Sequence, residues 1–186
     1  IHVESRLYAA ILSTWALLAG MALIMLGNGL QGTLLGVRAA QESFDTLSTG
    51  LIMTCFFSGF WLGSVLTPKI IRRVGHIRVF AALASLASAA VLLHALAVSP
   101  VAWGVIRIVT GLCFAGLYVI AESWLNDRAT NETRGALLSA YMLVSLGGMI
   151  CGQLLINVAD TRSFELFVLV SVLVSVAVVP IALTAA

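Results

Sequence analysis

The sequence contains few charged residues and no extended polar segment. Only 10% of its 186 residues are Asp, Glu, Lys or Arg, while 61% are hydrophobic and the mean hydropathy is +1.08. An average soluble domain has about 25% charged residues, so this composition excludes a soluble protein and predicts an integral membrane protein. The net charge of +2 is small and the basic residues are locally clustered, so we expect no nucleic-acid partner.

Residues that could carry out chemistry are also scarce. Cys55, Cys113 and Cys151 occur singly in three different apolar segments, without the paired spacing or the His neighbours of a metal site. The sequence has no nucleophile and base pair, no phosphate-binding loop and no paired catalytic carboxylates. We therefore expect no metal and no cofactor, and an enzyme is the class of protein that the sequence favours least.

What the sequence does contain is a series of long apolar segments. Each is long enough to cross a hydrocarbon core of ~30 Å, and none shows the alternation of a membrane β-barrel. Because a backbone in lipid must satisfy its own hydrogen bonds, we expect helices. The sequence predicts an all-α membrane protein, one six-helix bundle over residues 1–186, with helices at about 10–37, 47–67, 79–98, 101–124, 135–159 and 164–184.

Basic residues mark one side of this bundle. If the N-terminus is cytoplasmic, only Arg38 and Arg162 lie outside, and Arg107 lies within the membrane. The positive-inside rule then predicts that both termini are cytoplasmic. The basic residues placed inside are Arg6, Lys69, Arg72, Arg73, Arg78, Arg128 and Arg134.

The segment 101–124 carries two charges, Arg107 and Glu122. A charge costs up to ~3 kcal/mol at mid-membrane, so each should face protein or water. At 100° per residue, both charges fall within about 60° of Gly111 and Tyr118 on one stripe, which we expect to face inward. The two charges are ~22 Å apart along the helix, too far to pair with each other.

Amide side chains are candidate partners for Arg107. Asn28 and Gln31 share one face of the first segment, and Gln31, Arg107 and Gln153 each lie ~9 Å from the outer surface. If the three segments meet at that depth, we expect a site for an anionic or hydroxyl-rich solute, with Tyr118 contributing. The alternative is a purely structural set of hydrogen bonds around the guanidinium.

Glu122 lies about one helical turn from the cytoplasmic boundary. We expect it to form an inner latch, either with Arg128 and Arg134 or with the loop that carries Arg72 and Arg73. The alternative role is a proton carrier, on which burial and neighbouring arginines would have opposite effects.

Two further patterns concern packing. Segments one and four are the polar ones and segments three and six carry few polar groups, which predicts two three-helix units with inverted topology. In the fifth segment, Gly147, Gly148 and Gly152 form a GGxxxG pattern. This pattern predicts close approach of another helix, or alternatively a contact along which helices slide during transport.

Three stretches resemble a known family. They are PKIIRRVGHIR between the second and third segments, RIVTGLCFA in the fourth, and ETRGALLSAY at the start of the fifth. Over nearly the whole chain, they resemble the N-terminal half of the major facilitator superfamily, in a bacterial inner-membrane branch of poorly assigned substrate. The resemblance implies half of a twelve-helix fold, with the first and fourth helices of each half lining a central cavity and the halves rocking for alternating access.

The family's loop signature is matched only in part. Arg73, Gly75 and Arg78 fit its basic and glycine positions, whereas Arg72 stands where the family has Asp and Pro68 where it has Gly. The resemblance thus implies a loop that lacks the family's usual acidic residue. Together with the latch expected at Glu122, the predicted cytoplasmic gate comprises Arg72, Arg73, Gly75, Arg78, Glu122 and Arg134. In the fourth helix the family has an Arg followed, after three residues, by a Gly, and Arg107 and Gly111 match this pattern. In the family this Arg often has a role in the cavity, sometimes in proton coupling.

Together these observations favour secondary active transport of a small polar or amphipathic solute. The alternative is a non-transporting membrane subunit, derived from a transporter half, that docks in a larger complex. The expected partners are a small solute, membrane lipid and either a second six-helix half or a partner membrane subunit.

Overall fold

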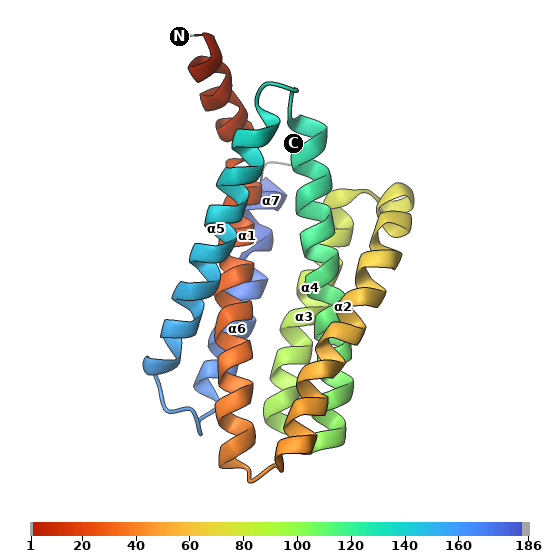
Figure 1. Cartoon of the computed structure of the whole chain (residues 1–186), viewed down its shortest axis with the longest axis vertical. Helices are drawn as coiled ribbons and strands as arrows, with labels where there is room; N and C mark the ends of the chain where they lie inside the picture. The colour runs from red at the N-terminus through yellow and green to blue at the C-terminus, as the bar shows by residue number, and fades with distance from the viewer. Residues whose placement is uncertain (1, 184–186) are drawn as a thin grey trace.

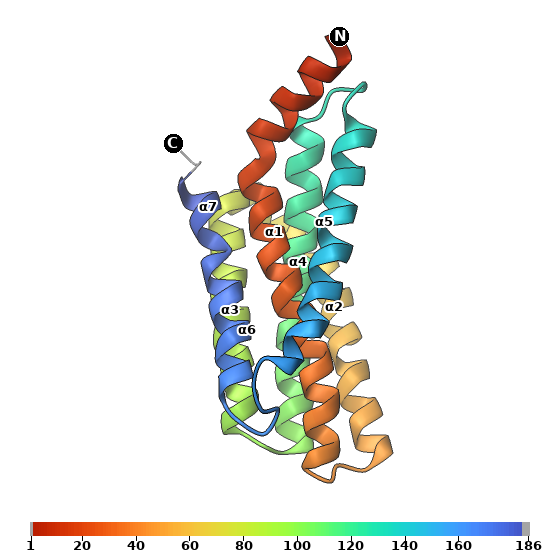
Figure 2. The ribbon, with the colours of Figure 1, turned by 90° about the vertical axis from the view of Figure 1, so that its left-hand side faces the viewer.

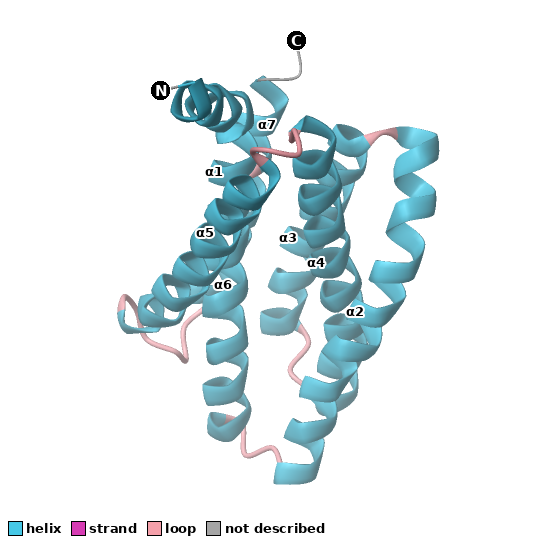
Figure 3. Cartoon of the chain, turned by 45° about the horizontal axis from the view of Figure 1, so that its top comes forward, coloured by secondary structure: helices cyan, strands magenta, loops and turns pink. Residues whose placement is uncertain are grey.

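The computed structural model describes the backbone of residues 2–183 and the side chains of residues 14–183. Over this range the chain is helical, with short loops and no strand (Figure 3). This confirms the predicted all-α class. The elements are α1 (His2–Gln41), α2 (Thr46–Val74), α3 (His76–Leu96), α4 (Pro100–Arg128), α5 (Arg134–Leu154), the 3-10 turn η1 (Leu155–Asn157), α6 (Glu165–Val176) and α7 (Val178–Leu183).

Six helical stretches among the described residues are long and apolar enough to cross a membrane. α1, α2 and α4 extend beyond the apolar segments seen in the sequence at both ends, because polar residues continue these helices. α3 and α5 both begin and end earlier than expected, with their last residues at Leu96 and Leu154. The segment predicted as one helix at 164–184 is divided into α6 and α7 around Ala177. Pro180 explains the break, because proline has no N–H to donate to the carbonyl of Val176.

Local sequence sets the ends of the helices. The carboxylate of Asp45 accepts from the Ser48 N–H at 3.1 Å and caps α2, and these Ser48 hydrogen bonds hold the pKa of Asp45 below its usual value. The hydroxyl of Ser99 accepts from the Ala102 N–H at 3.2 Å and caps α4, with Pro100 in the first turn. Capping by short polar side chains therefore fixes where α2 and α4 begin.

The helices pack as two groups. α1 lies against α5, α6 and α7, whereas α4 lies against α2 and α3, and α3 and α6 join the groups (Figures 1 and 2). The start of α1, α7, and the α2–α3 and α4–α5 connections lie at one end of the bundle. Lys69, Arg72, Arg73, Arg78, Arg128 and Arg134 belong to this basic end, whereas Arg6 lies outside the described side chains.

Glycines allow α2 and α4 to approach backbone to backbone. A Cβ on Gly59 or Gly63 would collide with α4 carbonyl oxygens, and a Cβ on Gly111 of α4 would collide with the carbonyl of Phe56. Only glycine fits at these positions, since the space is filled by rigid backbone rather than by flexible side chains. The α2–α4 spacing is therefore encoded in both helices.

A matching contact joins α1 to α5. A Cβ on Gly152 would collide with the carbonyl of Leu26, and a Cβ on Gly148 would lie 2.9 Å from Cβ of Met25. These contacts confirm that the GGxxxG pattern supports close helix packing. Gly147 was wrongly included, because nothing lies within 4 Å of a Cβ built there and its face points away from α1.

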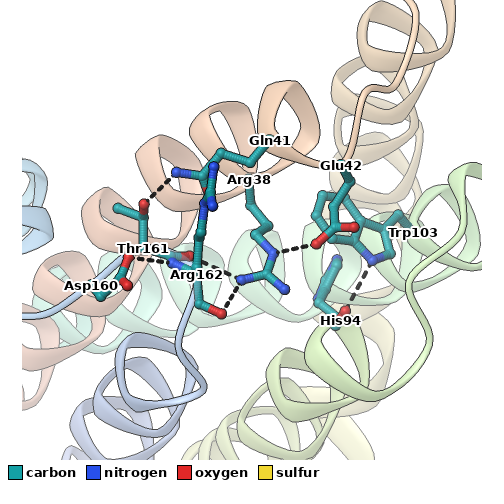
Figure 4. Close-up of polar contacts among 8 residues, drawn as sticks. All are labelled: Arg38, Gln41, Glu42, His94, Trp103, Asp160, Thr161 and Arg162. Atoms are coloured by element: carbon teal, nitrogen blue, oxygen red, sulfur yellow. Dashed lines mark hydrogen bonds and ion pairs between the residues drawn. The ribbon is translucent and has the colours of Figure 1, made fainter.

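Polar contacts tie the end opposite the basic one, which we call the outer end (Figure 4). Arg38 Nε pairs with a Glu42 carboxylate oxygen at 2.8 Å, and its Nη1 donates to the carbonyl of Thr161 at 3.2 Å and to that of Arg162. Gln41 Nε2 donates to the Thr161 hydroxyl at 2.6 Å. The end of α1 is thereby held to the loop between α5 and α6.

Trp103 forms a second contact at the outer end. Its ring nitrogen donates to the backbone carbonyl of His94 at 2.9 Å, and its ring packs edge-on against those of Phe44 and His94. Trp103 and His94 are both fully buried. This indole therefore joins α3, α4 and the α1–α2 turn.

The glycine contacts make a stability prediction. We expect Gly59→Ala to lower the free energy of unfolding by roughly 1–3 kcal/mol, the usual cost of overpacking a rigid contact. Gly147→Ala is the matched control and should be neutral or slightly stabilising, because alanine favours a helix by up to ~1 kcal/mol over glycine. Thermal unfolding of the detergent-solubilised protein measures both. Equal midpoints for the two variants would contradict the packing account.

Candidate functional site

A groove of about 570 Å³ opens between α1, α2, α4 and α5. It lies where the two helix groups face each other, and α2 and α5 form its flanks. Its lining combines aromatic rings with a few polar groups. The lining residues are Asn28, Phe56, Phe57, Phe60, Ser64, Ala115, Tyr118, Val119, Glu122 and Met149.

Apart from Ser64 of α2, whose hydroxyl donates to the Trp61 carbonyl at 2.7 Å, the polar groups of the groove come from α1 and α4. The Tyr118 hydroxyl donates to the Met25 sulfur at 2.7 Å, and the Asn28 amide lines the same groove. Glu122 is exposed to the groove. Among the described side chains, no Lys, Arg or His nitrogen lies within ion-pair distance of its carboxylate. The groove therefore offers an amide, a phenol and one uncompensated carboxylate.

Aromatic rings of α2 form one wall of the groove. Phe60 lies between Phe56 and Tyr118, with centroid distances of 6.0 Å to each, and Phe57 packs edge-on against Phe56. The sequence prediction omitted these phenylalanines because it followed charged and amide side chains. Their clustering within one short stretch of the second segment was the available signal.

Arg107 lies behind this wall rather than in the groove. Its side chain is buried at 6% exposure, with Cζ 4.2 Å from the Phe56 ring centroid and Nη2 4.0 Å from the Met53 sulfur. Its Nε and Nη1 have no hydrogen-bond partner among the described residues. Burying an unpaired cation costs several kcal/mol. The cation–π contact with Phe56 offsets only part of that cost, since such contacts contribute about 2 kcal/mol when desolvated.

The predicted amide layer is dispersed. Gln31 is fully buried on α1 and neither its oxygen nor its nitrogen has a partner among the described residues, so it does not hydrogen-bond Arg107. Gln153 is exposed on α5 and does not line the groove. Of the five predicted contact residues, the structure brings only Asn28 and Tyr118 into the groove, together with the predicted gate residue Glu122.

At the basic end, the predicted gate residues lie around the α2–α3 turn and the start of α5. Gly75 ends α2 with φ of 92°, a left-handed conformation that favours glycine. The side chains of Arg72, Arg73, Arg78 and Arg134 are exposed, and in the described structure none forms an ion pair with Glu122. The latch stays a prediction.

The contact that the structure does show there involves His76. Its Nε2 lies 3.0 Å from the Ser123 hydroxyl and 3.8 Å from a carboxylate oxygen of Asp127. This contact joins the start of α3 to the end of α4. Within the described range, no three His, Cys, Asp or Glu residues converge as they would around a metal ion.

The six membrane-length helices agree with a comparison to known families. The sequence model of the family described as Major Facilitator Superfamily matches residues 17–185. The chain belongs to the Major Facilitator Superfamily. This confirms the resemblance seen in the loop and helix motifs.

The chain is similar to several proteins of enterobacteria. One, from Enterobacter sp. (strain 638), is an uncharacterized MFS-type transporter with 32% identity over 168 residues, which cover 90% of this chain and 44% of that protein. Another, YcaD of Escherichia fergusonii, has 32% identity over 169 residues, with the same coverage. YcaD of Escherichia coli O45:K1 has 30% identity over 168 residues. The chain thus spans less than half the length of the curated relatives it matches.

Membership of the superfamily indicates the general class of protein to which the chain belongs. Superfamily members are generally transporters rather than enzymes, and the six apolar helices with enterobacterial relatives support a multi-pass protein of a bacterial inner membrane.

The groove makes an accessibility prediction. In protein whose other cysteines are replaced by alanine, we expect Asn28→Cys to react readily with a water-soluble maleimide, because Asn28 lines the groove. Gln31→Cys, three residues further along α1, should react slowly because Gln31 is fully buried. Mass spectrometry of the labelled protein gives both rates. Faster labelling at position 31 than at position 28 would place the groove elsewhere.

Proposed function

We propose that this chain is the N-terminal half of a secondary active transporter that moves a small solute by alternating access. The observation that carries the proposal is the groove, in which polar groups of α1 and α4 face the open side between α2 and α5. Transporters bind substrate near the middle of the membrane between such helix groups. The relatives are named as transporters, which supports the same conclusion over a docking subunit.

A second six-helix half would close the groove. α2 and α5 flank it and expose large apolar side chains, including Phe57, Trp61, Leu143 and Ile150, at 59–73% of their surface. The matched relatives have more than twice the length of this chain, which leaves room for such a half. We infer that the second half packs over these two helices, with the groove between the halves.

The packing also supports the inverted repeat. In an inverted repeat, α1, α2 and α3 correspond to α4, α5 and α6. The contact between α1 and α5 then corresponds to that between α4 and α2, and the contact between α1 and α6 corresponds to that between α4 and α3. All four contacts are present. The α1–α5 pair and the α2–α4 pair both place glycines against backbone carbonyls. We propose two three-helix units of opposite orientation. With the basic end in the cytoplasm, both termini are cytoplasmic.

The groove chemistry suggests how a solute is held. Aromatic rings provide apolar contact, while Asn28, Tyr118 and Glu122 provide polar contacts, which together suit a small amphipathic solute. We propose that Arg107, directly behind Phe56, is the coupling residue or becomes a solute contact when that ring moves. Gln31 and Gln153 would contact the solute in other conformations of the transporter, in which the helices have shifted.

The gate proposal concerns the basic end. We propose that Glu122 pairs with Arg72, Arg73 or Arg134 when the groove is closed to the cytoplasm, with Gly75 and Arg78 shaping the loop. The exposed positions of these side chains leave them free to form such pairs.

Replacing Arg107 tests the transport proposal. We expect Arg107→Ala in the full-length protein to abolish uptake of any solute found by screening reconstituted vesicles, because the mutation removes the cation behind the groove wall. Folding should persist, since the removed group is an unpaired buried charge. Uptake of labelled solute and the thermal midpoint are the two measurements.

Arg162→Ala at the outer end is the matched control, because its exposed side chain lies away from the groove. It should transport normally. Normal uptake by Arg107→Ala would remove this residue from the mechanism, and a full-length protein that accumulates no solute under any ion gradient would contradict secondary transport.

Glu122→Gln tests proton carriage. If Glu122 binds the coupled proton, the glutamine variant should lose the pH dependence of uptake, because an amide cannot be protonated in that range. If Glu122 is only a latch, the rate should fall while the pH profile keeps its shape. The measurement is initial uptake rate against pH, and Asp127→Asn provides an acidic control at the same end that does not line the groove.

A further inference from the structure

A second cavity lies at the basic end, apart from the groove. Its volume is about 360 Å³, and it is formed where the α2–α3 turn meets the end of α4. The lining combines two arginines, a histidine and a tryptophan with apolar and glycine residues. The lining residues are Val74, Gly75, His76, Ile77, Arg78, Trp124 and Arg128.

The charge in this cavity is positive and uncompensated. Arg78 and Arg128 both line it, and no carboxylate does. In the part of the chain whose side chains are described, neither arginine forms an ion pair, and the nearby Asp127 instead faces His76 at 3.8 Å. Two arginines that line one cavity without an acid favour binding of a phosphate group, which accepts hydrogen bonds from guanidinium N–H groups.

The backbone adds to this preference. α3 begins here without a side-chain cap and without an acidic residue in its first turn. The free N–H groups of a first turn carry partial positive charge. Gly75 leaves open space beside them, since nothing lies within 4 Å of a Cβ built on it. An anion in the cavity would therefore meet both arginines and backbone donors.

The position of the cavity favours a lipid over a soluble anion. It lies at the ends of three membrane-spanning helices, α2, α3 and α4, where headgroups of the bilayer are concentrated. Trp124 is of the residue type that settles at the interface, and Val74 and Ile77 provide apolar walls for the glycerol region. Basic pockets between membrane helices are suited to anionic headgroups.

We propose that this cavity binds the phosphate of an anionic phospholipid, held by Arg78 and Arg128 against the start of α3. This site differs from the groove and does not depend on the transport proposal. The bound lipid would fix the α2–α3 turn against α4, where His76 already contacts Ser123.

Native mass spectrometry of the full-length protein tests the proposal. The probe is phosphatidylglycerol, titrated against phosphatidylcholine with the same acyl chains. We expect the wild type to retain phosphatidylglycerol preferentially, and Arg78→Gln/Arg128→Gln to bind it at least about tenfold more weakly because two charge-assisted contacts are lost. Lys69→Gln/Arg134→Gln is the matched control, which removes the same charge from the same end but outside the cavity, and it should bind normally.

The other outcomes overturn the proposal. Equal loss in both double variants would mean diffuse attraction to a basic surface, and equal binding of the two lipids would mean no anion site. Displacement of phosphatidylglycerol by inorganic phosphate would assign the cavity to a soluble phosphate. If the cavity double variant does not fold, the single substitution Arg128→Gln at an exposed position gives the same comparison against Arg134→Gln.

Discussion

The close backbone contact between paired helices is the constraint on which the rest of the structure depends. Glycines on α2, α4 and α5 place α2 against α4 and α1 against α5 with no side chain between them. In lipid, apolar side chains gain little by leaving the surrounding hydrocarbon, so such contacts and the dispersion they allow hold helices together. Two tight pairs result, and the groove lies where the pairs face each other.

This helix packing determines which side chains line the groove. Because α2 is drawn against α4, its phenylalanines form a wall beside Tyr118, and the same approach places Phe56 over Arg107. The wall separates the buried guanidinium from the open groove. Phe56 therefore belongs both to the surface of the groove and to the surroundings of Arg107.

The two ends of the bundle are built differently. At the outer end, Arg38 and Trp103 tie α1, α3, α4 and the α5–α6 loop together through hydrogen bonds to backbone carbonyls. At the basic end, the arginines remain without acidic partners in the described structure, and His76 at the start of α3 contacts Ser123 and Asp127 of α4. The outer end is thus held together by these hydrogen bonds, whereas the arginines of the basic end are exposed and form no ion pair in the described structure.

The sequence by itself determined the number and type of the membrane helices, the clustering of basic residues and the close approach at Gly148 and Gly152. Those features follow from hydropathy and local residue spacing, which do not depend on a neighbour. Only the tertiary structure decided which side chains share a site, because the depth of a residue along its helix says nothing about rotation toward a partner. Gln31, Arg107 and Gln153 lie at similar depths in the sequence prediction, yet the structure separates them. Gln31 is buried inside the bundle, Arg107 lies behind Phe56, and Gln153 is exposed on α5.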